Sequence, residues 1–119
     1  MKKIYHLPNC GTCKKILEQL NVDDSVLVRD IKTQAITAEE VDEMAILAGS
    51  YEALFSRVAM KYRSMGLDKM TLSEKDYKSY IMQEYTFLKR PTVIVGNRIF
   101  VGSSKNNVES LKKAFNESV

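Results

Sequence analysis

Cysteine and histidine are scarce in this sequence of 119 residues, which contains two cysteines and a single histidine. A structural zinc site needs four ligands, usually supplied by two separated pairs of side chains. His6, Cys10 and Cys13 could form only part of such a site, so we expect no bound metal. A stabilising disulfide is not expected either, because the loop between the cysteines is short and nothing in the sequence indicates secretion.

Long apolar runs and a strong charge imbalance are also absent. No stretch approaches the roughly 20 apolar residues of a membrane-spanning helix. Met1–Lys3 is basic, but neither a long apolar core nor a small-residue cleavage site follows, so we expect no signal peptide. The net charge of +3 is too small to indicate a nucleic-acid-binding surface. We therefore expect one cytoplasmic domain over residues 1–119 that binds neither membranes nor nucleic acid.

The two cysteines lie between a predicted strand and a predicted helix. Residues 4–7 form a short apolar run that ends at Pro8, and Cys10 and Cys13 follow at once. Apolar residues then recur at positions 13, 16, 17 and 20, which is the spacing of one helix face. A strand, a Cys-x-x-Cys motif and a helix in this order are typical of a thioredoxin-like redox site.

The first turn of a helix is a favourable place for a thiolate. Its backbone N–H groups have no partners within the helix, and the helix dipole places partial positive charge there. The pKa of a cysteine in such a motif can fall to roughly 3.5–7.5. Cys10, before the helix, is the candidate nucleophile, and Cys13, on the apolar face, is the candidate resolving thiol. The same pattern would also fit Cys13 as a small core residue, with Cys10 as a lone nucleophile.

The next part of the chain predicts a second strand and then a helical insertion. Residues 25–31 are rich in β-branched residues and indicate a second buried strand, parallel to the first because a helix connects the two. The insertion covers about residues 37–88. Thr37 and Ser73 each begin a predicted helix, and a third predicted helix runs from 51 to 65 between them. The helix that begins at Ser73 is predicted to extend its apolar stripe to Leu88.

Two strands and a helix come after the insertion. Residues 90–95 and 98–101 are apolar runs separated by Gly96-Asn97, which predicts an antiparallel hairpin. The fold class is therefore α/β, a thioredoxin-like mixed four-stranded sheet (βαβ then ββα) with an inserted helical subdomain. In such a sheet the proline that opens the third strand, here Pro91, is usually cis and faces the Cys-x-x-Cys loop. A trans proline at the start of an edge strand is the alternative.

Several short motifs resemble those of the ArsC/Spx family. They are Pro8-Asn9-Cys10-Gly11-Thr12, Ala53-Leu54-Phe55-Ser56-Arg57, Met65-Gly66-Leu67 and Leu88-Lys89-Arg90-Pro91. The resemblance covers nearly the whole chain. The family contains glutaredoxin-coupled arsenate reductases, the Spx regulators that bind RNA polymerase, and many members without a known substrate.

The resemblance implies roles for residues around the first cysteine. Cys10 matches the cysteine that attacks arsenate in the reductases, and Arg90 matches an arginine that holds the anion. A guanidinium suits that role because it offers an oxyanion a planar fork of donors. Gly11, Thr12 and Pro91 are expected to line the substrate site, and Lys14 and Arg57 to add positive charge to it.

At two further positions where the family's anion site has arginine, this sequence has other residues. One position corresponds to Ser56, which Arg57 follows directly, and the other corresponds to Val101. Arg98 lies three residues before Val101, so the two side chains are expected on opposite faces of the strand. Arg98 is therefore a poor replacement for the missing arginine.

These residues support two main functions. The first is a thiol–disulfide oxidoreductase of the ArsC type that reduces arsenate or a disulfide, with no bound cofactor and with glutathione, glutaredoxin or thioredoxin as electron donor. The second is a redox-sensing transcriptional regulator, because Spx proteins use Cys-x-x-Cys as a switch, whereas the reductases usually carry serine at the position of Cys13. Gly49 resembles a glycine on the Spx surface that contacts RNA polymerase, and it also ends a predicted helix. A redox-active dithiol whose partner is an unidentified protein disulfide is a third interpretation.

Overall fold

The computed structural model describes residues 1–117, which belong to two compact units. The sheet unit comprises residues 1–35 and the segment from Arg90 onward, and the helical unit comprises residues 36–89. Between residues 1 and 117, none of the helices is long and apolar enough to cross a lipid bilayer.

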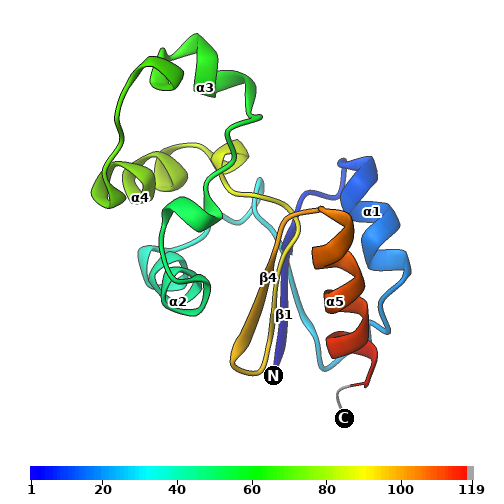
Figure 1. Cartoon of the computed structure of the whole chain (residues 1–119). Coiled ribbons are helices and arrows are strands. Elements are labelled where there is room, and N and C mark those ends of the chain that lie inside the picture. The colour runs from blue at the N-terminus through cyan, green and yellow to red at the C-terminus, as the bar shows by residue number, and fades with distance from the viewer. Residues whose placement is uncertain (118–119) are drawn as a thin grey trace. The chain divides into compact units, whose positions relative to one another are not determined.

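The sheet unit contains a mixed four-stranded sheet of order β2-β1-β3-β4 (Figure 1). Its strands are β1 (Lys2–His6), β2 (Leu27–Asp30), β3 (Thr92–Val95) and β4 (Arg98–Val101). Strand β1 runs parallel to β2 and antiparallel to β3, and β3 and β4 form a hairpin. The hairpin turns at Gly96, where a positive φ of 62° favours glycine. The predicted α/β fold and its strand directions are confirmed.

Two helices pack on one face of this sheet, α1 (Gly11–Glu18) and α5 (Lys105–Glu117). The shared core consists of Ile4, Ile16, Leu20, Val26, Val93, Val95, Phe100, Leu111 and Phe115. Asn116 joins the C-terminal ends of the two helices. Its Oδ1 accepts the N–H of Asn21 at 2.8 Å, and its Nδ2 donates to the carbonyl of Gln19 at 3.0 Å. These two bonds hold the C-terminal end of α1 beside α5.

Strand β2 is an edge strand and not the buried strand that its composition predicts. Leu27 and Val28 are 41% and 44% exposed. The β-branched run correctly indicated a strand, but burial depends on the strand order, which leaves β2 with a neighbour on one side only. The strand also covers only Leu27–Asp30 of the predicted range.

The helical unit contains the helices α2 (Ala38–Ala48), α3 (Met60–Ser64) and α4 (Glu74–Gln83), and the 3₁₀ turns η1 (Glu52–Leu54), η2 (Leu67–Lys69) and η3 (Tyr85–Phe87). Thr37 and Ser73 form capping boxes with Glu40 and Asp76, so both predicted helix starts are confirmed. Gly49 ends α2 with a φ of +98°. This backbone conformation by itself accounts for a glycine at that position.

The single helix predicted over residues 51–65 is wrong. Phe55 instead forms an isolated β-bridge with Leu88. The N–H of Ser56 donates to the carbonyl of Phe87 at 2.7 Å, and the N–H of Lys89 donates to the carbonyl of Leu54 at 2.9 Å. These backbone groups are thus bonded across the unit and cannot take part in a continuous helical ladder.

The predicted extension of the helix from Ser73 to Leu88 is also wrong. Helix α4 ends at Gln83, and Glu84 adopts an extended conformation (φ −142°, ψ 114°). Leu88 is buried, but it reaches the core from the segment after η3 and not from a helix face. The apolar spacing alone could not distinguish these two routes to burial.

Candidate active site

Cys10 lies directly before α1, as the cysteine spacing predicted. Its N–H donates to the carbonyl of Leu7 at 3.0 Å, and its own carbonyl accepts the N–H of Lys14 at 3.0 Å. The backbone at Cys10 is extended (φ −86°, ψ 114°), so the loop after β1 leads straight into the first helical turn. The side chain is partly exposed, and its thiol is free.

The surroundings of Cys10 favour its thiolate. Partial burial by itself would raise the pKa of this thiol, but hydrogen bonds and a nearby charge outweigh it, and the pKa is lowered from its ordinary value. The sulfur accepts hydrogen bonds from the backbone N–H and the thiol of Cys13 and from the N–H of Thr12, and the positive charge of Arg90 adds to their effect. Cys10 is therefore more ionised at neutral pH than an ordinary cysteine.

Cys13 has the opposite character. Its side chain is 0% exposed, and burial raises its pKa to about 11. Hydrogen bonding to Cys10 and the negative charge there act in the same direction, whereas the N–H of Leu7 and the charge of Arg90 oppose the shift. Cys13 thus remains a protonated thiol at neutral pH and donates to the sulfur of Cys10.

This hydrogen bond has a measurable consequence for alkylation. We expect the rate of reaction of Cys10 with iodoacetamide, measured by mass spectrometry, to rise with pH around a midpoint below that of an ordinary thiol. Cys13→Ala removes a donor to the thiolate and should raise the midpoint. Cys13→Ser keeps a donor at the same place and should raise it less. An unchanged midpoint in Cys13→Ala would show that the thiol of Cys13 does not stabilise the Cys10 thiolate.

Arg90 and Pro91 belong to the sheet unit and precede β3. The Arg90–Pro91 peptide bond is cis, as predicted. The carbonyl of Pro91 accepts the N–H of Gly102 at 2.9 Å, which ties this segment to the end of β4. The charge of Arg90 acts on the pKa of both cysteines, so the fold brings this predicted residue to the dithiol.

Gly11, Thr12 and Lys14 line the first turn of α1 and are exposed. A Cβ atom added to Gly11 would meet no other heavy atom within 4 Å. The space beside the first helical turn is therefore open to a ligand. The contacts of these three residues with a substrate remain a prediction.

Arg57 lies in the helical unit and already has partners there. Its guanidinium donates to Oε2 of Glu52 at 2.7 Å and to the hydroxyl of Tyr77 at 2.9 Å. Bonding to Glu52 raises the pKa of Arg57. Its neighbour Ser56 is buried. A role of Arg57 in holding substrate remains a prediction. A substrate would have to compete with Glu52 and Tyr77 for the guanidinium.

Arg98 lies at the end of the sheet away from Cys10. In the strand register it pairs with Val95, and Val95 pairs with Lys2 at the start of β1, whereas Cys10 follows the end of that strand. Arg98 therefore takes no part in the site around the two cysteines.

His6 is a residue that the sequence suggested only as a metal ligand. It ends β1 beside Asp30 on β2, and its Nδ1 is buried without a hydrogen-bond partner. Burial lowers the pKa of His6, and the negative charge of Asp30 opposes that shift. Among residues 1–117, no three His, Cys, Asp or Glu side chains lie close enough together to share a metal ion. Only the strand register places His6 next to Asp30, so sequence spacing could not reveal this pair.

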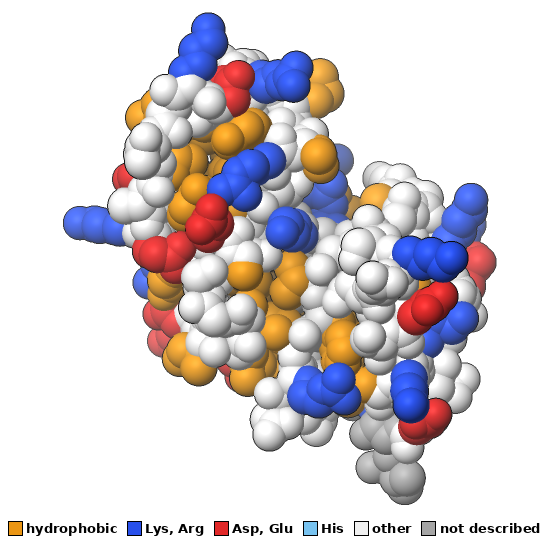
Figure 2. Space-filling model, viewed as in Figure 1, with side chains coloured by type: hydrophobic (Ala, Val, Ile, Leu, Met, Phe, Trp, Pro, Cys, Tyr) orange, Lys and Arg blue, Asp and Glu red, His pale blue; other side chains and the backbone are white. Residues whose placement is uncertain are grey.

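On one face of the molecule the positive charge is dispersed (Figure 2). On the face shown in Figure 2, Lys and Arg side chains are scattered among acidic, apolar and uncharged residues and do not gather into one patch. The net charge is +3.

A mixed sheet of this order, with Cys-x-x-Cys at the start of α1 and a cis proline before β3, defines a thioredoxin-like dithiol protein. The model of the ArsC family matches residues 5–111. This chain therefore belongs to the ArsC family.

Individual relatives are distant in sequence and close in fold. The chain is 25% identical over 100 residues to an arsenate reductase of Yersinia enterocolitica, a match that covers 81% of this chain and 71% of that protein. A YFFB protein superposes with a TM-score of 0.79 at 21% identity, covering 97% of this chain and 99% of the other. An arsenate reductase from Vibrio cholerae superposes with a TM-score of 0.77 at 17% identity, covering 95% and 96% of the two chains. These structural likenesses support the fold.

Proposed function

We propose that this protein is a thiol–disulfide oxidoreductase of the arsenate reductase-like type, in which Cys10 is the nucleophile and Cys13 the resolving thiol. The observation that carries the proposal is the difference between the two thiols. Cys10 is partly exposed with a lowered pKa, and Cys13 is buried, protonated and hydrogen-bonded to it. A reactive thiolate hydrogen-bonded to a second thiol is the starting arrangement for a two-step reduction.

The reaction begins when the Cys10 thiolate attacks a sulfur of a disulfide substrate. A mixed disulfide forms on Cys10, and the other half of the substrate leaves as a thiolate. The thiol of Cys13 then gives up its proton to that leaving group or to solvent and attacks the sulfur of Cys10. The second half of the substrate leaves as a thiolate, and two electrons have passed from the protein, which now holds a Cys10–Cys13 disulfide. Glutathione, glutaredoxin or thioredoxin reduces this disulfide.

Arsenate would follow an analogous course. The Cys10 thiolate attacks arsenic(V), and a hydroxide leaves as water after taking up a proton; Cys13 then attacks the Cys10 sulfur, the sulfur–arsenic bond breaks with its electron pair on arsenic, and arsenite leaves as the Cys10–Cys13 disulfide forms. The charges favour a disulfide substrate over arsenate. Arg90 acts on both thiols, but Arg57 is paired with Glu52 and Arg98 lies at the other end of the sheet. One arginine, with the exposed Lys14 on the first turn of α1, suits the carboxylates of a glutathione mixed disulfide better than it suits a small polyanion. We further propose that the protein works in the reducing cytoplasm, where its thiols would stay free.

Coupled oxidation of NADPH tests this proposal. The protein would be assayed through glutathione and glutaredoxin, and separately through thioredoxin, with a glutathione mixed disulfide or arsenate as substrate. We expect turnover of the mixed disulfide and slower turnover of arsenate. Absence of turnover with both substrates and all donors, while the Cys10–Cys13 disulfide still forms and opens reversibly, would refute the reductase and favour the RNA polymerase-binding regulator.

A further inference from the structure

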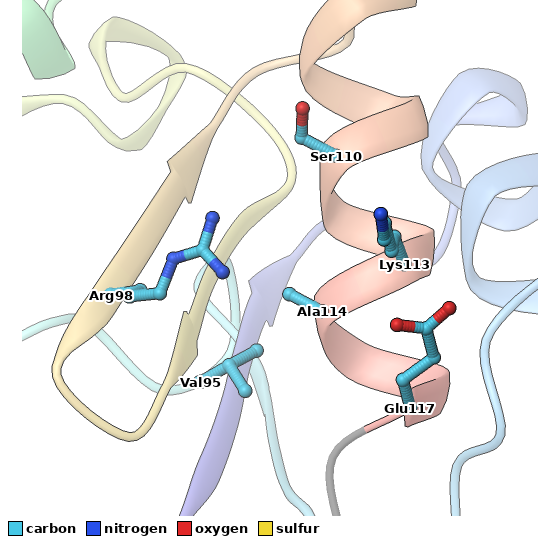
Figure 3. A pocket seen from close by; sticks show the side chains of 6 residues that line it. All are labelled: Val95, Arg98, Ser110, Lys113, Ala114 and Glu117. Atoms are coloured by element: carbon cyan, nitrogen blue, oxygen red, sulfur yellow. The ribbon is translucent and has the colours of Figure 1, made fainter.

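A groove lies between the β3–β4 hairpin and α5, within the sheet unit. Its volume is about 440 Å³. It is lined by Val95, Arg98, Ser110, Lys113, Ala114 and Glu117 (Figure 3). Val95 pairs with Lys2 at the start of β1, whereas Cys10 follows the end of that strand. The groove is therefore separate from the dithiol, and a ligand site there is independent of the proposed function.

Strand register and helix period bring these side chains to one surface. Val95 and Arg98 are paired across the hairpin. Arg98 lies on the same sheet face as Phe100, which packs in the core against α5, because side chains two residues apart in a strand share a face. The lining residues of α5 are spaced i, i+3, i+4 and i+7 and so form one stripe along the helix.

Two cations of this groove have no acidic partner among the described residues. Within residues 1–117, neither Arg98 nor Lys113 makes an ion pair or a side-chain hydrogen bond. The Arg98 guanidinium lies over the ring of Phe100, 5.0 Å from its centroid, and Figure 3 shows it directed from β4 toward α5. Stacking on a ring orients the guanidinium plane and leaves the N–H groups at its edge available to an anion.

We propose that this groove binds a phosphate monoester of a small hydroxylated molecule, with the phosphate between Arg98 and Lys113. The guanidinium fork can bind two phosphate oxygens, the ammonium adds a point charge, and the Ser110 hydroxyl is a third donor. Val95 and Ala114 provide apolar contact for the carbon skeleton. A groove of about 440 Å³ lies within the ~300–1,000 Å³ range of ligand pockets.

Glu117 limits the choice of ligand. Its carboxylate lines the same groove, where it would repel a second phosphate and accept a hydrogen bond from a ligand hydroxyl. A molecule with one phosphate and several hydroxyl groups therefore fits the distribution of charge better than a bisphosphate does.

Ribose 5-phosphate is the probe for this site. Its binding to the whole chain would be measured by titration, from the chemical-shift changes of the backbone amides in NMR spectra. We expect saturable shifts confined to residues 95–98 and 110–117, weaker binding of inorganic phosphate, and no binding of ribose. Arg98→Gln should weaken binding at least tenfold. Lys105→Gln makes the same change in net charge at an exposed position of α5 outside the groove, and it should leave the affinity within twofold.

Two results would overturn the proposal. One is equal weakening of binding by Arg98→Gln and Lys105→Gln, which would show attraction to net charge and not to a site. The other is the absence of saturable shifts in the groove at up to tens of millimolar ribose 5-phosphate. Folding of both variants can be confirmed in the same spectra, so a failure to fold would not be mistaken for a failure to bind.

Discussion

Cys10→Ser is expected to lower the rate of turnover of both the mixed disulfide and arsenate by on the order of a thousandfold or more. The serine hydroxyl does not ionise near neutral pH, and only an ionised sulfur attacks a disulfide at a useful rate. Cys13→Ser should leave the first attack intact and stop the second. In a single turnover without external thiol, this variant is expected to accumulate the Cys10–glutathione mixed disulfide, which intact mass spectrometry detects directly.

The two cysteine variants distinguish a resolving thiol from a core residue. If Cys13 only packs against the sheet, the wild-type protein should also stop at the mixed disulfide without external thiol, and added glutathione should release the second product from wild type and Cys13→Ser at the same rate. That result would remove Cys13 from the mechanism and leave Cys10 as a lone nucleophile resolved by glutathione. Circular dichroism of both variants is the control for folding, because Cys13 is fully buried and its replacement affects the packing of α1.

Phe55→Ala is expected to lower the free energy of unfolding by about 3–5 kcal/mol, as measured by urea denaturation. Phe55 is 0% exposed, and its ring lies 5.0 Å from the rings of both Phe87 and Tyr77 and 5.8 Å from that of Tyr62. Removing it would leave a cavity at the centre of this aromatic cluster in the helical unit. The loss of these contacts adds to the loss of buried apolar area.

Val58→Ala is the matched control for this prediction. A continuous helix over residues 51–65 would put Phe55 and Val58 on one apolar face, and both variants would then destabilise the protein. In the structure Val58 is 91% exposed, so its replacement should change the free energy of unfolding by less than about 0.5 kcal/mol. A substantial loss of stability in Val58→Ala would contradict the observed break between η1 and α3.

Some features of this protein arise from residues close together in the sequence. The Cys10–Cys13 spacing and the apolar face behind it placed both cysteines at the start of α1, because a helix start depends on a few neighbouring residues. Capping boxes at Thr37 and Ser73 and the turn at Gly96 were predictable for the same reason. The thioredoxin-like order of elements predicted the cis bond at Pro91, and the family motifs added the anion-holding role expected of Arg90.

Other features depend on contacts between segments far apart in the chain, and only the tertiary structure decided them. The exposure of β2 results from the strand order, and the backbone bonds of residues 54–56 to 87–89 break the helix that apolar spacing predicted. Arg90 reaches the dithiol because β3 pairs with β1, at the opposite end of the sequence. The sequence alone determined which residues carry reactive or charged groups. Long-range pairing determined which of those groups meet, because neither strand register nor burial is encoded in local spacing.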